Sequence, residues 1–476
     1  MSHADLVKLT AVEAVDLLKK RKVSPLEMID AAAARIAEVD KVVNALPTLC
    51  LGRAREQAKR LESEPGDKNY AGYLAGLPIA VKDLNPVKGV RTTYGSPIYK
   101  DYVPDHSDHM VEMLDRRGAV TIAKSNTPEF GAGANTFNEV LGTTVNPWDT
   151  RKSCAGSSGG AAVALATGQV WLATGSDLGG SLRSPASFCG IVGMRPSPGR
   201  VAHGPSLMPF ANLSVDGPMA RTVADTALFL DAMVGQHPSD PISLAEPTTS
   251  FSAAVANPGK LSRVAFSADL NGITPVDPEV REIVSKAVRL FEGLGATVEE
   301  ACPDLKESQE TFQILRAAQF AASKAPLLDK HRDLLKPEVI WNIEKGQKLT
   351  AEEIGKAERW RGELFYRTAR FFESYDVLVC PTTIVPPYPV EQRYVAEVDG
   401  HKFDNYIEWV LVCSAFTLTS CPAISVPCGF TKDGLPVGLQ IVGKPRGEAA
   451  MLQAAKLFEE AAGLATRLPI DPIVKA

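Results

Sequence analysis

The 476-residue sequence predicts an α/β protein. Short apolar runs typical of buried strands alternate with amphipathic stretches at helical spacing, as in layered α/β architectures. Hydrophobic residues make up 45% of the chain and charged residues 22%, which provides ample material for a large core. No internal repeat, low-complexity segment or clear linker interrupts the pattern. We therefore expect a single domain over residues 1–476.

Two helices are expected to open the chain. Thr10 and Ser24 each stand three residues before a glutamate, which is the capping-box pattern of a helix N-terminus. Pro25 suits the first position of the second helix. Residues 53–61 indicate a third, exposed helix, so the N-terminal helices are predicted over residues 10–61.

The remaining elements follow from periodicity and turn residues. Strands are predicted over residues 76–81, 119–124, 170–174, 261–267, 296–300, 376–382, 422–427 and 437–442. Helices are predicted over residues 107–117, 161–168, 223–234, 277–293, 308–328, 352–374 and 449–462. Asp225 is expected to face solvent or to cap its helix.

Composition argues against several classes of function. The formal net charge of −5 offers no electrostatic reason to bind nucleic acid. No apolar run approaches the roughly 20 residues of a membrane-spanning helix. The first residues lack the apolar region of a signal peptide, so we expect a cytoplasmic protein without nucleic-acid or membrane partners.

Metal and cofactor binding are not expected. The eight cysteines are scattered and show no Cys-x-x-Cys spacing, so most are expected to be small buried residues. His106 and His109 form a His-x-x-His pair without an evident third ligand, and we interpret both as surface residues. Cys154 lies near a serine-rich bend, but no motif makes it a nucleophile.

Two glycine-rich bends hold serines that could perform chemistry. The first is Cys-Ala-Gly-Ser-Ser-Gly-Gly at residues 154–160, and the second is Gly-Ser-Asp-Leu-Gly-Gly-Ser-Leu-Arg-Ser-Pro-Ala at 175–186. Ser157 and Ser181 sit within these bends, and serines in such turns are candidates for a nucleophile and its proton relay. A flexible linker is disfavoured because the first bend runs directly into an apolar helical pattern. A phosphate-binding loop is disfavoured because its Gly-Lys-Ser/Thr ending is absent.

Lys82 follows the short apolar strand at residues 76–81. A lysine at the end of a buried strand either extends to solvent or is buried with partners. Lysine can act as a base only when neutral, and burial lowers its pKa because desolvation penalises the ammonium form. The two serine bends favour the second interpretation.

The serine bends resemble the diagnostic stretch of the amidase signature family, whose members hydrolyse amide carbon–nitrogen bonds. That stretch reads Gly-Gly-Ser-Ser-Gly-Gly, then Gly-x-Asp-x-Gly-Gly-Ser-x-Arg-x-Pro-Ala, and only Ala155 departs from it. Segments 76–83, 193–200, 216–222 and 434–440 also match, in the family's order. The resemblance implies one domain with a large mixed, twisted sheet between helices. Its expected parts are a catalytic core over about 76–235, a variable substrate funnel over about 236–375, and C-terminal core strands with a helix over 376–476.

By this resemblance, Ser181 is the nucleophile that forms an acyl-enzyme. Ser157, held through a cis peptide bond, relays the proton to Lys82. The oxyanion hole and substrate-binding groups are expected from the backbone of Leu178, Gly179, Gly180 and Gly131. Ser158, Asp177 and Arg183 are expected to hold the bends in place around these groups. His203 would be considered as the base only if lysine were not.

Three functions stay open on the sequence alone. The first is a stand-alone amidase acting on a small-molecule amide, with hydrazides or esters as related substrates and a possible homodimer as its form. The second is the A subunit of a glutamine-dependent tRNA amidotransferase, which typically has Arg-Gln-Pro where this chain has Ser184 between arginine and proline. The third is a non-catalytic binding protein, which would be expected to lack Lys82, Ser157 or Ser181. These features favour the stand-alone amidase. Phe130, Met208, Phe210 and Trp341 are candidate pocket walls.

Overall fold

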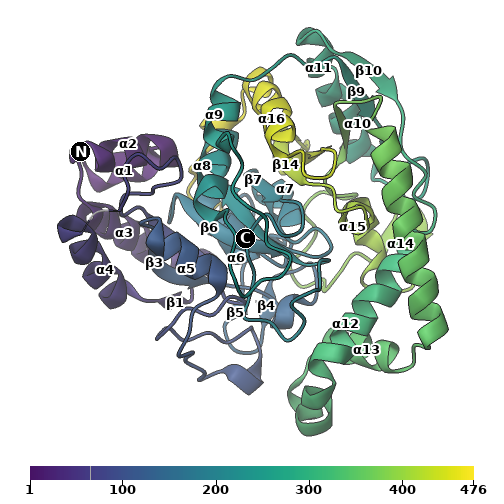
Figure 1. The fold of residues 1–476 in the computed structure, drawn as a ribbon, viewed down its shortest axis with the longest axis horizontal. Helices are drawn as coiled ribbons and strands as arrows, with labels where there is room; N and C mark the ends of the chain where they lie inside the picture. The colour runs from purple at the N-terminus through teal and green to yellow at the C-terminus, as the bar shows by residue number, and fades with distance from the viewer. Residues whose placement is uncertain (65, 476) are drawn as a thin grey trace.

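A computed structural model describes residues 1–64 and 66–475 and confirms the α/β class (Figure 1). The strands of the main sheet are β1 (Thr48–Leu49), β2 (Pro78–Lys82), β3 (Val120–Ser125), β6 (Leu172–Asp177), β7 (Val192–Arg195), β8 (Val215–Ala220), β9 (Arg263–Phe266), β10 (Thr297–Glu300), β11 (Val377–Pro381), β14 (Ala423–Phe430) and β15 (Pro436–Val442). Two small hairpins add β4 (Phe137–Asn138) with β5 (Gly142–Thr143), and β12 (Glu397–Val398) with β13 (His401–Lys402).

The main sheet is mixed, as expected. Its strand order is β1-β3-β2-β6-β8-β7-β14-β15-β11-β9-β10. Strand β2 runs parallel to both β3 and β6, and β9 runs parallel to both β10 and β11. The other neighbouring pairs are antiparallel. Because β2 and β6 are parallel, their carboxyl ends at Lys82 and Asp177 lie at the same edge of the sheet.

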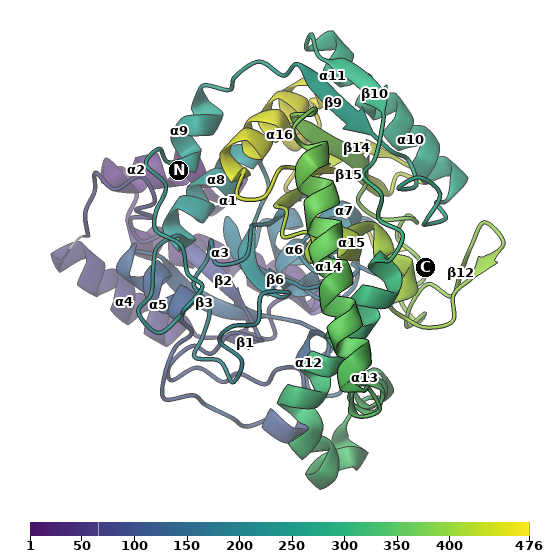
Figure 2. The same ribbon diagram turned by 45° about the vertical axis from the view of Figure 1, so that its right-hand side comes forward.

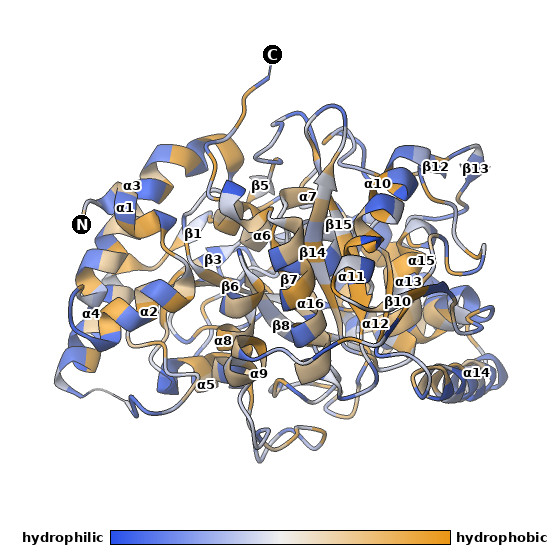
Figure 3. Cartoon of the chain, turned by 90° about the horizontal axis from the view of Figure 1, so that it is seen from above, coloured by the Kyte–Doolittle hydropathy of each residue, from blue (hydrophilic) through white to orange (hydrophobic). Residues whose placement is uncertain are grey.

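Helices cover both faces of this sheet. They are α1 (His3–Lys8), α2 (Ala11–Lys19), α3 (Pro25–Val43), α4 (Leu51–Ser63), α5 (His109–Arg116), α6 (Gly159–Ala166), α7 (Arg183–Cys189), α8 (Val223–Met233), α9 (Phe251–Ala256), α10 (Pro278–Val288), α11 (Leu290–Gly293), α12 (Ser308–His331), α13 (Pro337–Gln347), α14 (Ala351–Phe371), α15 (Leu411–Leu418) and α16 (Glu448–Ala462). Figure 3 shows α6 and α7 on one side of the strands and α8 and α9 on the other. None of the helices in the described residues is long and apolar enough to cross a membrane.

Helices α12, α13 and α14 form a helical arm beside the sheet. Figures 1 and 2 show α12 and α13 side by side at one end of the molecule, with α14 running along the same flank. A small apolar cluster, separate from the main core, joins α12 to α13 through Phe320, Leu328, Val339 and Ile343. Helix α13 was not predicted from the sequence.

The N-terminal prediction is partly confirmed. Thr10 and Ser24 form complete capping boxes at the starts of α2 and α3. The expectation of two opening helices is wrong, because Ser2 and Asp5 form another capping box that starts α1. Helix α4 is not simply exposed, because Ala54 and its neighbours on one face are buried.

Several buried positions contradict the local patterns. Strands β7 and β8 were not predicted, and β8 contains Pro218 opposite Thr174 in the middle of the sheet, where proline argues against a strand. Asp225 is fully buried, and its carboxylate accepts a hydrogen bond from the Val12 N–H at 2.9 Å. His109 is also buried, and its ring stacks on that of His237 with centroids 3.7 Å apart.

Candidate active site

Lys82 occupies the carboxyl end of β2 and is completely buried. Its backbone N–H donates to the Thr174 hydroxyl in the middle of the adjacent strand β6 at 3.0 Å, which ties the end of β2 to that strand. The Nζ donates to three hydroxyl oxygens, at 2.8 Å to Ser157, 2.9 Å to Ser158 and 3.0 Å to Ser176. The lysine is therefore buried with partners rather than extended to solvent.

The environment of Lys82 favours its neutral form. Burial lowers the pKa of Lys82 from its ordinary value of 10.5 to about 7, although the carboxylates of Asp216 and Asp177 act in the opposite direction. Its three nearest partners are neutral hydroxyl groups, which can donate to a neutral amine as well as accept from it. Near neutral pH, the amine can therefore accept a proton from a neighbouring hydroxyl.

Ser157 lies just before α6, and the peptide bond between Gly156 and Ser157 is cis. Helix α6 enters the core at once, which explains the glycines at its start. A Cβ at Gly160 would lie 2.3 Å from the Asn126 nitrogen and 2.6 Å from the Ala45 oxygen. Only glycine allows the chain to pass this close to two backbone segments. This close packing holds Ser157 beside the lysine.

Asp177 organises the turn that carries Ser181. One carboxylate oxygen accepts the Gly180 N–H at 3.0 Å and the other accepts the Leu182 N–H at 3.1 Å. Arg183 donates to both oxygens, at 3.0 Å from Nε and 2.8 Å from Nη2. Burial alone would raise the pKa of Asp177, but Arg183 and Arg195 hold it well below its usual range. The carboxylate thus stays charged and holds both sides of the turn.

The predicted oxyanion groups differ in their hydrogen bonding. The N–H of Gly180 donates to Asp177, and the N–H of Gly131 donates to the Pro128 carbonyl at 2.9 Å. Among the described residues, the N–H groups of Leu178 and Gly179 have no intramolecular partner. Both of these residues line the pocket beside Ser157 and Ser181.

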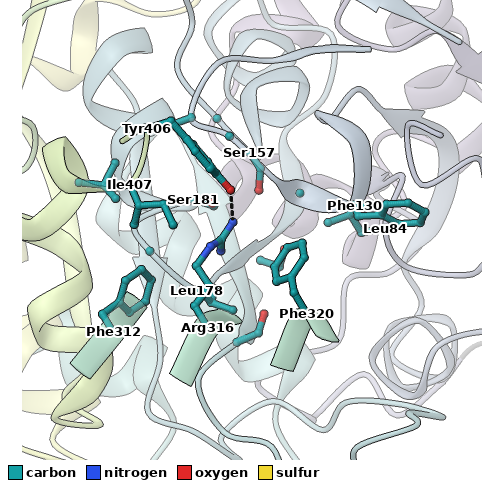
Figure 4. A pocket seen from close by; sticks show the side chains of 18 residues that line it. Leu84, Phe130, Ser157, Leu178, Ser181, Phe312, Arg316, Phe320, Tyr406 and Ile407 are labelled. Carbon is teal, nitrogen blue, oxygen red and sulfur yellow. Dashed lines mark hydrogen bonds between the residues drawn. The ribbon is translucent and has the colours of Figure 1, made fainter. Parts of the chain in front are cut away.

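A pocket lies over the two serines (Figure 4). Its walls come from both serine bends, the helical arm and the segment before α15. They comprise Leu84, Phe130, Gly131, Gly133, Ala134, Gly156, Ser157, Ser176, Leu178, Gly179, Ser181, Ser214, Phe312, Arg316, Phe320, Tyr406, Ile407 and Val410. Phe130 is thus a wall residue as predicted. Trp341 instead packs against Tyr406, and Phe210 is largely exposed on a loop.

Glu129 supports the pocket from outside. Its side chain is buried, and one oxygen accepts the Ser96 hydroxyl at 2.6 Å. The other accepts the backbone N–H of Lys336 at 2.8 Å, directly before α13. The carboxylate therefore connects the loop that carries Phe130 to the helical arm, which is a structural role.

Sequence reasoning missed four polar residues of this region: Ser176, Arg195, Arg316 and Tyr406. Ser176 and Arg195 lie inside segments that match the family pattern. Arg316 was detectable in principle, because Phe312, Arg316 and Phe320 recur every four residues and share one face of a helix. No local sequence pattern indicated that Tyr406 belongs to this site.

His203 does not qualify as the base. Its Nδ1 lies 2.8 Å from Asp216, and its side chain is half exposed outside the pocket lining. Partial burial opposes protonation of His203, but the hydrogen bond to Asp216 outweighs it and raises the pKa to about 10. A histidine that is already protonated at neutral pH cannot accept a proton from the nucleophile.

Among the residues that the structure describes, two side-chain groups outside the pocket bring possible metal ligands within 4.8 Å of one another. One comprises His109, Glu112 and His237, and the other comprises Asp108, His203 and Asp216. The two imidazoles of the first group are stacked at an interplanar angle of 17°, so their in-plane lone pairs run parallel instead of converging. Neither group lines the pocket, so neither could act on a substrate bound over Ser181.

Comparisons with known proteins agree with this geometry. The family model described as Amidase matches residues 27–452. The acylamidase of Rhodococcus erythropolis is 35% identical over 481 residues, covering 100% of both chains. The A subunit of the glutamyl-tRNA(Gln) amidotransferase of Geobacillus stearothermophilus is also 35% identical, covering 95% of this chain and 97% of its own.

Solved structures give the same result. A bacterial aryl acylamidase of the amidase signature enzymes superposes with a TM-score of 0.89 at 27% identity, covering 96% of this chain and 97% of its own. A 6-aminohexanoate cyclic dimer hydrolase solved with its substrate superposes with a TM-score of 0.88 at 26% identity, covering 97% and 99%. From the family match, these relatives and the shared fold, we conclude that the chain belongs to the amidase signature family.

Proposed function

We propose that this amidase hydrolyses a small-molecule amide through an acyl-enzyme on Ser181, with Ser157 as the proton relay and Lys82 as the base. The observation that carries the proposal is a completely buried lysine whose Nζ lies 2.8 Å from the Ser157 hydroxyl, beneath the pocket that Ser181 lines. An amine with a pKa of about 7 is suited to general base catalysis near neutral pH.

In the acylation step, Ser181 Oγ attacks the amide carbonyl carbon while its proton passes to Ser157 Oγ. The Ser157 proton passes to the neutral Lys82 Nζ, which becomes an ammonium. The tetrahedral intermediate then collapses: the carbon–nitrogen bond breaks, and the proton returns by the same path to the leaving nitrogen. Water attacks the resulting ester in the second half-reaction and releases the carboxylate, restoring Ser181.

The developing oxyanion is assigned to backbone N–H groups of the turn before Ser181. Leu178 and Gly179 are the stronger candidates, because the N–H groups of Gly180 and Gly131 already have acceptors. Loss of one such donor costs about 3 kcal/mol of transition-state stabilisation in comparable hydrolases. The charged Asp177, fixed by Arg183, supports the proposal because it holds the turn in one conformation before substrate arrives.

The pocket walls favour aryl or medium-length aliphatic amides. Phe130, Phe312 and Phe320 provide aromatic surface, and Leu84 and Val410 extend it. Such a lining binds apolar groups and leaves orientation to a few polar side chains. A homodimer and a cytoplasmic location stay predictions of the sequence.

The amidotransferase function is the second candidate, because the amidotransferase relative has the same percentage identity to this chain as the acylamidase. Ser184 stands where the A subunits of those enzymes typically carry glutamine, which favours the stand-alone amidase. We therefore expect the purified chain to hydrolyse anilides, including those with a carboxylate, far faster than glutamine. Robust glutaminase activity, or co-purification with a tRNA-binding protein, would reverse this assignment.

The decisive experiment is covalent labelling with a serine-directed phosphonate. We expect one adduct, mapped by peptide mass spectrometry to Ser181, and its loss together with amidase activity in Ser181→Ala. The control is Ser206→Ala, which removes the hydroxyl of an exposed loop serine and should keep both properties. An adduct on any other residue would refute the assigned nucleophile.

A further inference from the structure

Arg316 places a guanidinium in the wall of the pocket opposite the serines. It lies on α12, between Phe312 and Phe320 on the same helical face, and all three line the pocket. Figure 4 shows its side chain extending toward Tyr406, with the two phenylalanines on either side. The residue is only 7% exposed, so its charge lies almost entirely inside the protein.

The partners of this guanidinium are neutral. Its Nη2 donates to the Tyr406 hydroxyl at 2.9 Å, and its Nε donates to the Asn342 side-chain oxygen at 3.2 Å. The Phe320 ring lies 4.7 Å from its central carbon. Within residues 1–64 and 66–475, no carboxylate forms an ion pair with Arg316, and its Nη1 has no hydrogen-bond acceptor.

The surroundings offer Arg316 no carboxylate as an ion-pair partner among the described residues. The described residues that line the pocket include no aspartate or glutamate. The nearby charged side chains are mostly cations, since Lys324 lies 4.6 Å from the Phe130 ring and Lys336 approaches Gly133. Glu338 is engaged by Arg393, which donates to its two oxygens at 2.8 and 2.6 Å. Among the described residues, the pocket lining therefore contains the cation Arg316 and no carboxylate, although the chain has a net charge of −5.

Two fully buried arginines beside the turn before Ser181 illustrate the usual compensation of such a charge. Arg183 and Arg195 are completely buried, and both approach the Asp177 carboxylate. Burial of a charge is costly unless a counterion offsets it. Arg316 has no such counterion in the described part of the protein, yet it opens onto the cavity that receives the substrate.

We propose that Arg316 binds a carboxylate of the substrate, so that the enzyme selects amides that carry a free carboxylate in their acyl or amine part. This inference rests on the proposed function. The two N–H groups of Nη1 are directed to no acceptor among the described residues, and Tyr406 and Asn342 hold the guanidinium plane in place. An arginine held in this way can bind a carboxylate through charge-assisted hydrogen bonds from Nη1.

Two matched substrate pairs test the preference, each replacing a carboxylate oxygen with a methyl group. Succinyl para-nitroanilide against levulinyl para-nitroanilide tests the acyl side, and para-acetamidobenzoate against para-acetylacetanilide tests the amine side. We expect kcat/KM to favour the carboxylate about 10- to 100-fold in one pair, as expected for a charge-assisted hydrogen bond. Arg316→Gln should abolish that ratio, and Arg316→Lys should keep part of it.

A matched control separates the local charge from general damage. Arg361 is another largely buried arginine whose hydrogen-bond partners, Asn212 and the Leu418 carbonyl, are neutral, but it does not line the pocket. Arg361→Gln should therefore leave the carboxylate-to-ketone ratio at the wild-type value. A ratio near one for both pairs in the wild type, or an unchanged ratio in Arg316→Gln, would overturn the inference.

Calorimetry of the carboxylate and ketone compounds binding to the Ser181→Ala variant distinguishes this inference from the proposed function. This variant retains Arg316 but lacks the assigned nucleophile. We expect it to bind one carboxylate compound more tightly than the matched ketone, and this result does not depend on turnover. Hydrolysis of neutral anilides without any carboxylate preference would reject the role of Arg316 and leave the amidase proposal standing. Carboxylate-selective binding in a protein that hydrolyses no amide would reject the amidase proposal and leave the role of Arg316 standing. If Arg316→Gln does not fold, Tyr406→Phe should lower the ratio by releasing the guanidinium.

Discussion

The catalytic edge of the sheet and the helical arm meet at one pocket but differ in how their charged side chains are buried and paired. The catalytic edge comprises the ends of β2 and β6 with the turn before α7, and its buried charges are compensated. Asp177 pairs with two arginines, and Lys124 lies 3.3 Å from Asp83 with both side chains fully buried. On the arm, ion pairs such as Arg332–Glu344 are at the surface.

The difference indicates that the two regions have different roles. A compensated, buried polar network cannot be rearranged without leaving a charge or a donor unsatisfied, so it holds reacting groups in fixed positions. The arm packs through a small apolar cluster and faces the pocket with aromatic rings and one uncompensated cation. Changes on the arm can therefore alter substrate choice without disturbing the lysine and the serines.

The largest expected effect comes from removing the base at the catalytic edge. Lys82→Ala should reduce kcat/KM for a neutral anilide by roughly 10⁴-fold or more, as for other catalytic units that act together. Lys82→Arg should not restore activity, because the guanidinium stays protonated. Single-turnover acylation measures the effect, with the exposed Lys88→Ala as control. Near-normal acylation in Lys82→Ala would remove lysine from the mechanism.

The charge contrast predicts unequal losses of stability. Asp177→Asn leaves two buried arginines without a counterion, so it should lower the free energy of unfolding by about 3–5 kcal/mol. Arg332→Gln breaks only a surface pair of the arm and should cost less than about 1 kcal/mol. Urea unfolding of both variants compares the two regions directly. Equal losses would show that the catalytic edge is not the more strongly coupled region.

The pH dependence of acylation should depend on the titration of groups at the catalytic edge alone. Burial depresses the folded pKa of Lys82 to about 7, and the proposed mechanism needs the neutral amine. Acylation should therefore rise between about pH 6 and 8 and fall about tenfold per unit below that limb. The apparent value belongs to the coupled Lys82–Ser157–Ser181 unit. Arg316→Gln, which changes the arm, should leave the limb in place; a displaced limb would show that the two regions are not independent.

The smallest expected effect concerns the link between the regions. Glu129→Gln weakens the acceptor that joins Ser96 to the Lys336 N–H, so stability should fall by about 1–2 kcal/mol. We expect KM for an anilide to rise several-fold with a smaller change in kcat, because the pocket wall loosens while Lys82, Ser157 and Ser181 keep their positions. Steady-state kinetics separates the two constants, and Glu344→Gln on the exposed side of the arm is the matched control. A loss confined to kcat would place Glu129 in the chemistry.

Local sequence patterns determined much of the catalytic edge. The glycine-bracketed serines and the lysine at the end of an apolar strand identified the groups that the fold brings to one pocket or beneath it. The capping boxes at Thr10 and Ser24 also form as predicted. These features were readable because turns, caps and strand ends depend on residues within a few positions of one another.

Tertiary structure decided the features that depend on distant partners. Strand β8 forms despite Pro218 because its neighbours β6 and β7 hold it in the sheet, and Asp225 is buried because it accepts a hydrogen bond from Val12. Arg316 is held in the pocket wall because α12 packs against α13 and because Tyr406, 90 residues further along the chain, accepts its hydrogen bond. The sequence by itself identified the candidate residues for the proposed chemistry. The packing of distant segments decided which side chains became buried, paired or left with an uncompensated charge, because burial and ion pairing arise only when those segments meet.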